Sequence, residues 1–308
     1  MQKLLIIDTF NFLHRAYHAL PKTFTDSNGE PTNAVYGVTS MLINVFNQIK
    51  PTHAIAAVDS KEPTFRVEEF TGYKAQRKPM EETLAVQIPK VFEVLDAFGI
   101  KRLEVPGYEA DDVIATAAEK FSDEIDIIIV SNDRDLWQLT DKEVTIMAPA
   151  KGGVNEWIGR KEAEARMGFD VGFIADYKGL RGDPSDNIPG VYGVGDKTAK
   201  KLIDQFGSLE KVYKNLSKVE PESLRKKLEE NAEQALMSKK LALLVMDVPV
   251  TVSLEECKYK EFNKVKVKEV LERYNFKSLI KRLGFEVDDG SSRSKKKDVV
   301  HEDQLNLI

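Results

Sequence analysis

The chain has 308 residues and a formal net charge of −5, and 42% of its residues are hydrophobic. This length and composition can bury one large core or two smaller ones, whereas no apolar run approaches the roughly 20 residues of a membrane span. The single cysteine, Cys257, excludes an internal disulfide and a zinc site built on cysteines.

The apolar run before Asp8 is too short for the core of a signal peptide, so we expect a cytoplasmic protein that makes no membrane contact. The negative net charge does not by itself suggest nucleic acid as a partner. It does not exclude one either, because acids gathered in one place can mask bases gathered in another.

Short apolar runs alternate with amphipathic stretches through the first half of the chain. Runs typical of buried strands cover 3–7, 53–58, 100–105, 125–130 and 144–147, and the spacing of apolar residues predicts helices at about 10–20, 34–49, 82–98 and 113–121. This alternation predicts an α/β fold with a mostly parallel central sheet flanked by helices. The runs are continuous, as expected for parallel strands that are buried on both faces.

Acidic residues follow several of these predicted strands. Asp8, Asp59 and the pair Asp133 and Asp135 stand at or just beyond a strand end, and Glu109, Asp111 and Asp112 crowd the start of a helix. A single Asp in such a place is more often a cap or a turn residue. Together they indicate one shared rim, because ligand sites in open parallel sheets lie beyond the carboxyl ends of the strands.

Like charges gathered at one rim need cations between them. Oxygen ligands suit Mg²⁺ or Mn²⁺, and we expect two or more ions because one Mg²⁺ typically uses only one or two protein carboxylates. Paired metals of this kind serve in-line displacement at phosphorus. Other chemistries lack their motifs: no HExxH accompanies His14 and His18, and there is no GxxxxGK[ST] loop and no GxSxG elbow.

The segment 61–80 interleaves bases with aromatic residues directly after Asp59. Its bases are Arg66, Lys74, Arg77 and Lys78, and its aromatics are Phe65, Phe70 and Tyr73. Bases that meet phosphates and aromatics that stack on nucleobases are typical of an element that grips a nucleic-acid strand. We take Arg66, Tyr73 and Lys78 as candidate DNA contacts, with a solvated loop as the alternative.

The segment 189–207 places a glycine-rich turn before an amphipathic helix. Glycines let backbone N–H groups approach a phosphate closely, and the helix N-terminus favours negative charge. This arrangement resembles a helix–hairpin–helix DNA-binding motif, although a glycine turn can also be purely structural. The candidate DNA-binding residues are Gly190, Gly193, Gly195, Lys197, Thr198, Lys200 and Lys201.

Motifs along the whole chain resemble those of bacterial 5′→3′ exonucleases in the flap-endonuclease superfamily, which occur as the N-terminal domain of DNA polymerase I or as stand-alone proteins. The matching motifs, spread over about residues 1–285, are TNAVYG (32–37), TFR (64–66), GYK (72–74), YEADD (108–112), DRD (133–135) and KGLRGDPSDNIPGVYGVGDKTA (178–199). The resemblance implies a structure-selective 5′→3′ exonuclease and 5′-flap endonuclease. Such an enzyme hydrolyses phosphodiesters with two metal ions and removes RNA primers and flaps in replication and repair.

The resemblance also implies roles for residues. Lys74 would face the scissile phosphate, Arg77 would support it, and Tyr73 would belong to a helical arch that a 5′ single strand passes. The segment 189–207 would be a helix-three-turn-helix with a K⁺ ion beside a duplex phosphate. The partner would be branched or nicked duplex DNA with a 5′ single strand, bound by a monomer. One metal site would use Asp8, Asp59, Glu109 and Asp111, and a second would be surrounded by Asp112, Asp133, Asp135, Asp183 and Asp186.

Two residues depart from the family pattern. Thr9 stands where the family usually has Gly, which would alter how closely a substrate approaches Asp8. Asn132 also replaces a usual Gly, but Asn tolerates a left-handed backbone better than most residues. Since no implied metal ligand is missing, we expect activity.

We expect three parts: an α/β nuclease domain at 1–175 with a helical arch near 61–90, a helical DNA-binding subdomain at 176–287, and a disordered tail at 288–308. The tail ends in QLNLI (Gln304–Ile308), which is similar to the short peptide by which bacterial replication proteins bind the sliding clamp. Two rival functions remain open: a catalytically silent DNA-binding scaffold, and a ribonuclease of the related small acidic-site class.

Overall fold

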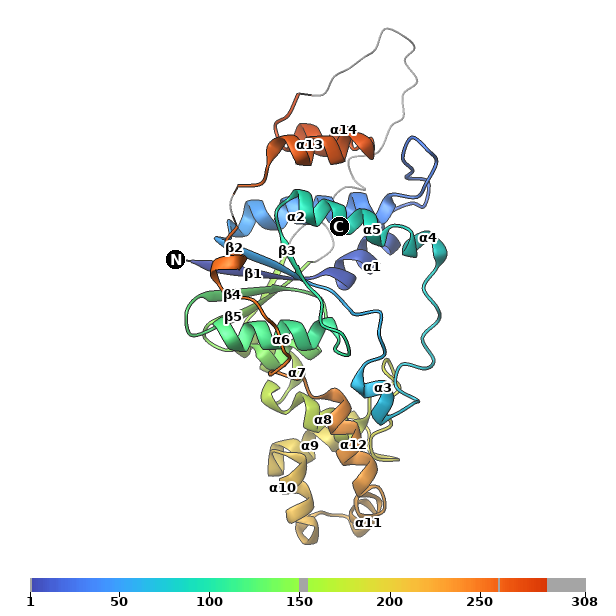
Figure 1. Ribbon diagram of the computed structural model, residues 1–308. Helices are drawn as coiled ribbons and strands as arrows, with labels where there is room; N and C mark the ends of the chain where they lie inside the picture. The colour runs from blue at the N-terminus through green and yellow to red at the C-terminus, as the bar shows by residue number, and fades with distance from the viewer. Residues whose placement is uncertain (1, 150–154, 260, 287–308) are drawn as a thin grey trace.

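The computed structural model describes residues 2–149, 155–259 and 261–286. Within these residues one six-stranded sheet forms the centre, with strand order β3-β2-β1-β4-β5-β6 (Figure 1). Five strands are parallel, which confirms the predicted fold class, and β6 runs antiparallel to β5. The strands are β1 (Lys3–Asp8), β2 (His53–Ala57), β3 (Lys101–Leu103), β4 (Asp126–Val130), β5 (Val144–Ala148) and β6 (Glu156–Ile158). The sequence did not reveal β6, because it is short and mostly exposed.

Alternate residues of the central strand β1 enter two hydrophobic cores on opposite faces of the sheet. Leu5 and Ile7 pack into the core that contains α1, α2 and α5, whereas Leu4 and Ile6 pack into the core that contains α6. Within the described ranges, the first face carries α1 (Thr9–Ala19), α2 (Asn33–Ile49), α5 (Ile88–Ala97), α13 (Lys264–Arg273) and α14 (Lys277–Arg282), and the second carries α6 (Ala110–Phe121).

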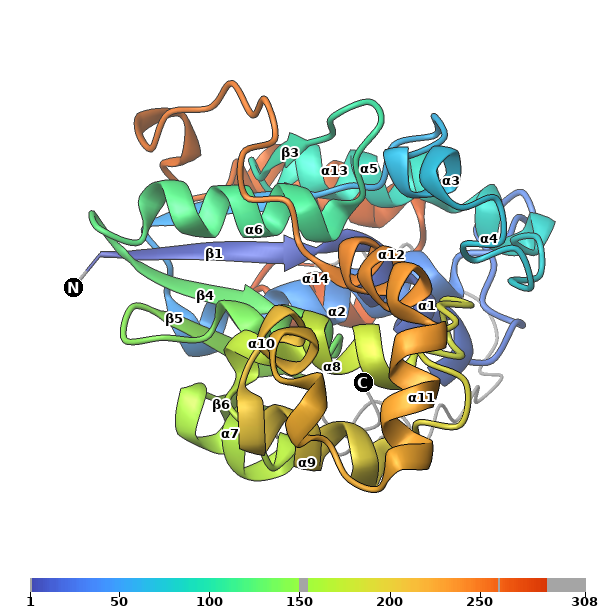
Figure 2. The same ribbon diagram turned by 90° about the horizontal axis from the view of Figure 1, so that it is seen from below.

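The second half of the chain forms a helical region that lies below the sheet in Figure 1 and faces the viewer in Figure 2. Its helices α8 and α12 pack closely because Gly179 has no side chain: a Cβ there would lie 3.0 Å from Lys239 Cβ. The helices are α7 (Arg160–Met167), α8 (Ile174–Arg181), α9 (Asp196–Phe206), α10 (Leu209–Lys214), α11 (Glu222–Glu230) and α12 (Ala232–Ala242). All follow the sheet in sequence and share the core of α6.

The last two helices depart from the subdomain expected at 176–287. The apolar faces of α13 and α14, including Val267, Leu271 and Ile280, are buried in the core of α2 and α5, on the far side of the sheet from α8 to α12. Figure 1 shows them stacked above α2 and α5. Their amphipathic pattern predicts that one face is buried, but it does not identify the partner, so sequence order was a poor guide to their place.

The segment 61–90, expected as a helical arch, contains two short helices before α5 begins at Ile88. These are α3 (Phe65–Glu69) and α4 (Glu82–Ala85), and the residues between them are mainly turns. The helix predicted at 82–98 is divided into α4 and α5, and Pro89 stands in the first turn of α5, where a missing N–H is tolerated. We call residues 70–77 the bridge loop.

The strand order creates a crevice at the carboxyl end of the sheet. The chain adds β2 and β3 on one side of β1 and β4 and β5 on the other, and open α/β sheets bind ligands at such a switch point. Asp8 is the last residue of β1 and Asp133 follows the end of β4 shortly after. Two of the predicted acids therefore stand at this crevice.

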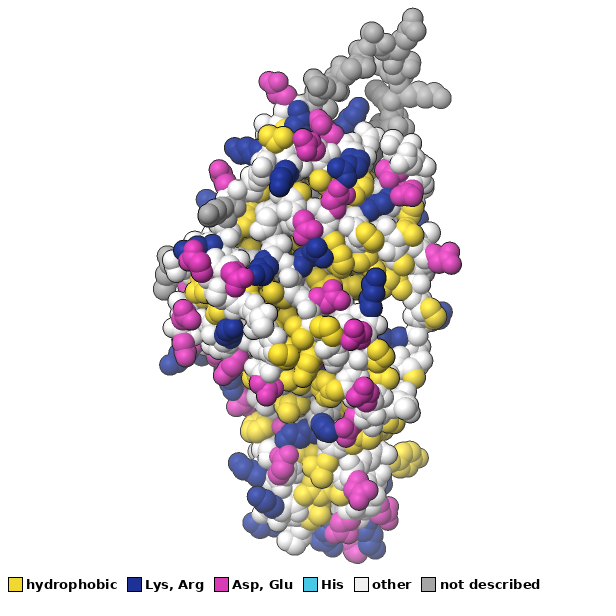
Figure 3. Space-filling model, viewed as in Figure 1, with side chains coloured by type: hydrophobic (Ala, Val, Ile, Leu, Met, Phe, Trp, Pro, Cys, Tyr) yellow, Lys and Arg dark blue, Asp and Glu magenta, His cyan; other side chains and the backbone are white. Residues whose placement is uncertain are grey.

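The outer surface is mixed in character. On the face shown in Figure 3, Lys and Arg side chains are interspersed with Asp and Glu, and hydrophobic side chains gather near its middle. None of the helices found in the described part of the chain has the length and apolar character needed to cross a membrane.

Candidate metal centre and nucleic-acid groove

Acids from several elements line one groove of about 770 Å³, and we call five of them the first acid group: Asp8, Asp59, Glu109, Asp111 and Asp133. Asp8 caps α1, accepting from Asn11 N at 3.1 Å and from Ser131 Oγ at 2.7 Å. Asp59, just beyond β2, accepts from Ala110 N at 2.7 Å and so holds the start of α6. The parallel register thus brings together acids that are distant in sequence.

The first acid group lacks side-chain cations except at one edge. Among the described residues, Asp111 has no hydrogen-bond or ion-pair partner. Its pKa is raised well above the usual value by burial and then by repulsion from Asp133, Asp8 and Asp59. Burial also raises the pKa of Asp8 to about 7, with added repulsion from Asp59 and Asp133. Carboxylates that face mainly other carboxylates are in an environment that favours a bound cation.

Glu109 Oε2 has two cations near it in the described residues, Arg66 Nη1 at 3.7 Å and Lys74. The Nζ of Lys74 donates to Glu109 Oε2 at 2.8 Å, and the Lys74 backbone has a φ of 53°. A lysine rarely adopts this left-handed conformation, and such strain concentrates at functional sites. Lys74 therefore lines the groove beside Glu109, and its role at a scissile phosphate stays a prediction.

The bridge loop is tied to the loop 183–188 by several contacts. Lys74 N donates to Asp186 O at 2.9 Å, Asn187 Nδ2 donates to Gly72 O at 2.6 Å, and Gln76 Nε2 reaches Pro184 O at 3.0 Å. Arg77 Nη2 also pairs with Asp186 Oδ1 at 2.5 Å. The two loops form one connected unit beside the acids.

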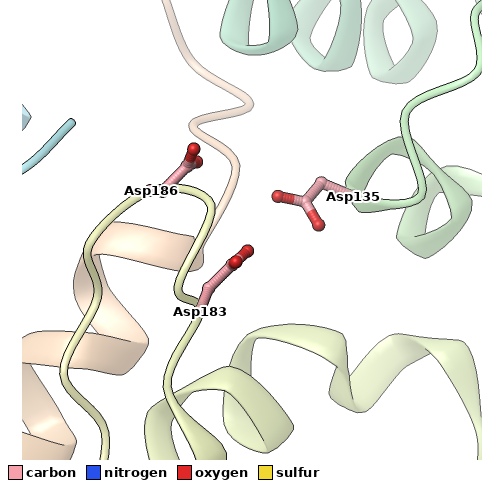
Figure 4. A group of neighbouring side chains, drawn as sticks. All are labelled: Asp135, Asp183 and Asp186. Carbon is pink, nitrogen blue, oxygen red and sulfur yellow. The ribbon is translucent and has the colours of Figure 1, made fainter. Parts of the chain in front are cut away.

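A second acid group consists of Asp135, Asp183 and Asp186, whose carboxylate oxygens lie within 4.8 Å of one another. Figure 4 shows Asp183 and Asp186 on one loop, with Asp135 facing them across a gap. Lys178 pairs with both Asp135 and Asp183, the latter at 2.5 Å. Burial raises the pKa of Asp135 to about 6. Burial also favours a higher pKa for Asp183, but the positive charge of Lys178 outweighs this effect, so the pKa of Asp183 is lowered.

Asp112 was wrongly assigned as a metal ligand. It is fully buried and accepts two hydrogen bonds from Arg66, at 2.6 and 2.7 Å, and further ones from Glu109 N and Val245 N. Neighbouring helical residues point about 100° apart, so Asp111 can face the groove only if Asp112 faces the interior.

Arg66 and Tyr73 were wrongly assigned as DNA contacts. Arg66 is 2% exposed, and besides Asp112 it donates to Leu241 O and Leu243 O, so it joins α3 to the end of α12. Tyr73 is 5% exposed, and its hydroxyl donates to Glu109 Oε2 at 3.1 Å. A ring buried in this way offers no face to a base; Lys78 in the same segment is exposed.

Gly190 was also wrongly assigned as a DNA contact. Its N–H donates to Ser238 Oγ at 3.0 Å, and its φ is 63°. A Cβ at this position would lie 2.1 Å from Gly182 N, so the residue must be glycine for internal packing.

The rest of the hairpin presents its polar groups outward. Gly195 is exposed at the start of α9, and a Cβ there would meet nothing within 4 Å. Gly193 is exposed with a φ of 76°, and Lys227 Nζ lies beside it. The remaining candidates are exposed or half-buried on α9: Lys197, Thr198, Lys200 and Lys201. The sequence missed Lys227 because it belongs to α11.

The two departures from the family pattern do not obstruct the groove. Thr9 begins α1, is 2% exposed, and does not line the groove. Asn132 lines it with a backbone outside the left-handed region, and its N–H donates to Asn11 Oδ1 at 3.2 Å. The expected change in access to Asp8 is therefore absent.

Both acid groups have the donor chemistry of a hard divalent cation. Asp8, Asp59, Asp111 and Asp133 offer only oxygen ligands, although His14 and His18 line the same groove, and among the described residues three ligand atoms lie within 4.8 Å of one another only in the second group. The second group has the same donors, but Lys178 already neutralises part of its charge. The sequence missed Lys178, which lies inside the KGLRGDPSDN motif.

Comparisons with known proteins agree with this geometry. A family model described as "5′-3′ exonuclease, N-terminal resolvase-like domain" matches residues 3–168, and one described as "5′-3′ exonuclease, C-terminal SAM fold" matches residues 171–265. The 5′-3′ exonuclease of Aquifex aeolicus is 37% identical over 96% of this chain and 99% of its own length. DNA polymerase I of Caldicellulosiruptor bescii is 43% identical over 92% of this chain, which spans about a third (33%) of that relative.

The fold also matches a solved structure, the bacteriophage T5 flap endonuclease in a pseudo-enzyme-product complex with DNA and metal ions. The TM-score is 0.67 at 21% identity, over 89% of this chain and all of that one. At this identity the likeness establishes the fold.

Proposed function

Because the chain belongs to the 5′-3′ exonuclease family, we propose that it is a structure-selective nuclease that depends on divalent metal. It acts as a 5′→3′ exonuclease and 5′-flap endonuclease and removes RNA primers and flaps in replication and repair. The observation that supports this proposal most strongly is that acids from the ends of β1, β2 and β4 and from the start of α6 line one groove.

The residues of the groove have different roles in the proposed reaction. When bound, Mg²⁺ or Mn²⁺ ions supply positive charge to the phosphate and increase the acidity of water. Asp111 and Asp133 hold this charge at the crevice, with Asp8 oriented by Ser131 and Asp59 by the α6 backbone. Lys74 adds a cation aimed at the phosphate, and Arg77 and the bridge loop keep it there.

The DNA partner spans two surfaces in this proposal. A 5′ single strand lies in the groove beside the bridge loop, and the flanking duplex contacts the hairpin through Gly195, Lys197 and Lys201, with K⁺ at the hairpin. A monomer is sufficient, because every proposed ligand comes from one chain. The clamp-like peptide Gln304–Ile308 and the expected tail lie outside the described residues; docking on the clamp, the domain boundary between residues 175 and 176 and the cytoplasmic location stay predictions.

A Mg²⁺-dependent digest of an end-labelled 5′-flap duplex tests the function. We expect products that end near the junction and carry a 5′-phosphate, with no cutting when EDTA replaces Mg²⁺. Binding without cutting would support the silent scaffold instead. Preferential cutting of single-stranded RNA over flap DNA would support the ribonuclease.

A further inference from the structure

A second pocket, of about 630 Å³, continues from the acid groove toward α9. It shares Asn11, Arg77, Asn132, Asp133 and Asp186 with the first, so the two form one path. At its far end it is lined by Asp196 and Lys200 of α9. The acids therefore stand between a pocket beside the bridge loop and a pocket that leads to the hairpin.

Six bases line this second pocket, and they differ in their partners. Four are compensated by carboxylates: Arg77 by Asp186, Arg166 by Glu156, Lys178 by Asp135 and Asp183, and Lys200 by Asp196. Arg134 and Arg181 have no hydrogen-bond or ion-pair partner among the residues that the structure describes. Asp196 lies close enough for its charge to act on Arg181, but no carboxylate forms a hydrogen bond or ion pair with either guanidinium in the described residues, so their N–H donors stay available to an anion.

Aromatic rings hold these two guanidinium groups in place. Arg134 lies 5.5 Å from the centre of the Trp137 ring, and Arg181 lies 5.8 Å from the centre of the Tyr177 ring. Both rings are almost fully buried, and Tyr177 is fixed further by its hydroxyl, which donates to Asp196 Oδ1 at 2.5 Å. An arginine stacked on a fixed ring loses less freedom when its donors meet an anion.

We propose that Arg134 and Arg181 bind backbone phosphates of the DNA strand that continues from the scissile phosphate into the duplex. The ligand is a phosphodiester because the free groups are planar donor forks, which match phosphate oxygens, and because the pocket joins the acids to the hairpin. The inference rests on the proposed function and deepens it by naming the residues that hold the duplex side of the substrate.

Steady-state cleavage of a 5′-flap duplex with Mg²⁺, over a KCl series, tests the two residues together. For R134Q/R181Q we expect a KM raised about 10-fold or more with a kcat within about 3-fold, because charged hydrogen bonds to substrate are lost away from the reacting bond. The slope of log(kcat/KM) against log[KCl] should become shallower by about 2, since each lost phosphate contact removes about 0.9.

Two variants serve as controls. R102Q removes an arginine that also stacks on a ring, that of Phe92 at 4.7 Å, but is paired with Asp96 and lines neither pocket, so KM and slope should match the parent. R134K/R181K keeps both charges and should keep the salt slope. Circular dichroism of each variant establishes that it is folded.

Chemical substitution of the DNA gives a test that does not depend on variant folding. Neutral methylphosphonates placed one at a time in the strand on the duplex side of the cleavage site should raise the KM of the parent protein at one or two positions. The same substitutions should add nothing in R134Q/R181Q.

A parent protein that cuts flap DNA while R134Q/R181Q behaves like R102Q would overturn this inference alone. A parent protein that does not cut flap DNA would overturn the proposed function together with it.

Discussion

The two acid groups solve the same electrostatic problem in different ways. Asp135 and Asp183 are bridged by Lys178 and Asp186 is paired with Arg77, so the second group carries its counter-charges within the chain. In the first group the Asp111 carboxylate has no such partner in the described residues, and the two cations that form ion pairs with the group, Lys74 and Arg66, both do so at Glu109. The number of nearby acids therefore does not predict how strongly a site favours a metal ion. The negative charge that has no positive partner within the chain does.

Asp111→Asn tests the part of the first group that has no counter-charge within the described residues. Removing one carboxylate from the uncompensated group should lower single-turnover cleavage of flap DNA by about 10³-fold or more, because transition-state charge loses its support. The metal-free variant should also melt at a higher temperature than the parent, because a buried repulsion is relieved. Asp123→Asn changes an exposed acid in the loop after α6 and is the matched control. It should change neither the rate of cleavage nor the melting temperature. Undiminished cutting would refute the ligand assignment.

Lys178→Met tests whether the second group depends on its internal cation. The loss should leave Asp135 and Asp183 without their counter-charge and lower the free energy of unfolding by about 3 kcal/mol, as measured with urea in EDTA. Added Mg²⁺ should recover more stability in the variant than in the parent, since binding to the folded state is linked to folding. The exposed pair of Lys200 and Asp196 provides the control, because Lys200→Met should cost less than about 1 kcal/mol. Equal stability of Lys178→Met and parent would contradict this reading.

Lys74→Ala removes the closer of the two side-chain cations that pair with Glu109 of the first group. We expect single-turnover cleavage to slow by about 10²-fold with saturating substrate, because a charge aimed at the transition state is lost. Lys78→Ala, in the same segment but exposed and remote from the acids, should slow it by less than about 10-fold. If Lys74→Ala cut as fast as the parent, the role assigned to this lysine would be wrong.

The stability of the metal-free protein should also depend on pH, although less strongly than on the substitutions above. The pKa of Asp8 is raised to about 7 and that of Asp111 is raised as well, so the folded state holds these protons more tightly than the unfolded state. Ionising them costs stability, so the melting temperature in EDTA should fall from about pH 5 to about pH 8. The lowered pKa of Asp183 acts in the opposite sense, but its contribution is lost only on acidification below about pH 4. Mg²⁺ should abolish most of the fall; a flat profile in EDTA would count against the uncompensated charge.

The sequence predicted the sheet and the gathering of acids because both follow from simple periodicity. Parallel strands align their carboxyl ends, so Asp8, Asp59 and Asp133 could be placed at one rim without coordinates. The family resemblance assigned both Asp111 and Asp112 as metal ligands, although a helix turns about 100° per residue and only Asp111 faces the groove.

Residues that act through packing were harder to predict. Arg66 resembles a surface base in its segment, and only the fold shows that its guanidinium is buried against Asp112. Lys178 and Lys227 come from helices whose faces are set by tertiary contacts, and periodicity could not orient them toward the acids or the hairpin. The same limit applies to α13 and α14, whose buried faces were evident but whose partners were not.

The connection between the bridge loop and loop 183–188 has a mechanical consequence. Because Lys74, Gly72 and Gln76 are hydrogen-bonded to the backbone or side chains of that loop, any swing of the bridge that admits a strand must drag Asp186 along with it. We therefore expect entry of the strand and assembly of the reactive geometry to be a single gated event. With the two loops joined in this way, the Asp186 carboxylate takes its place in the second acid group only when the bridge loop is in place.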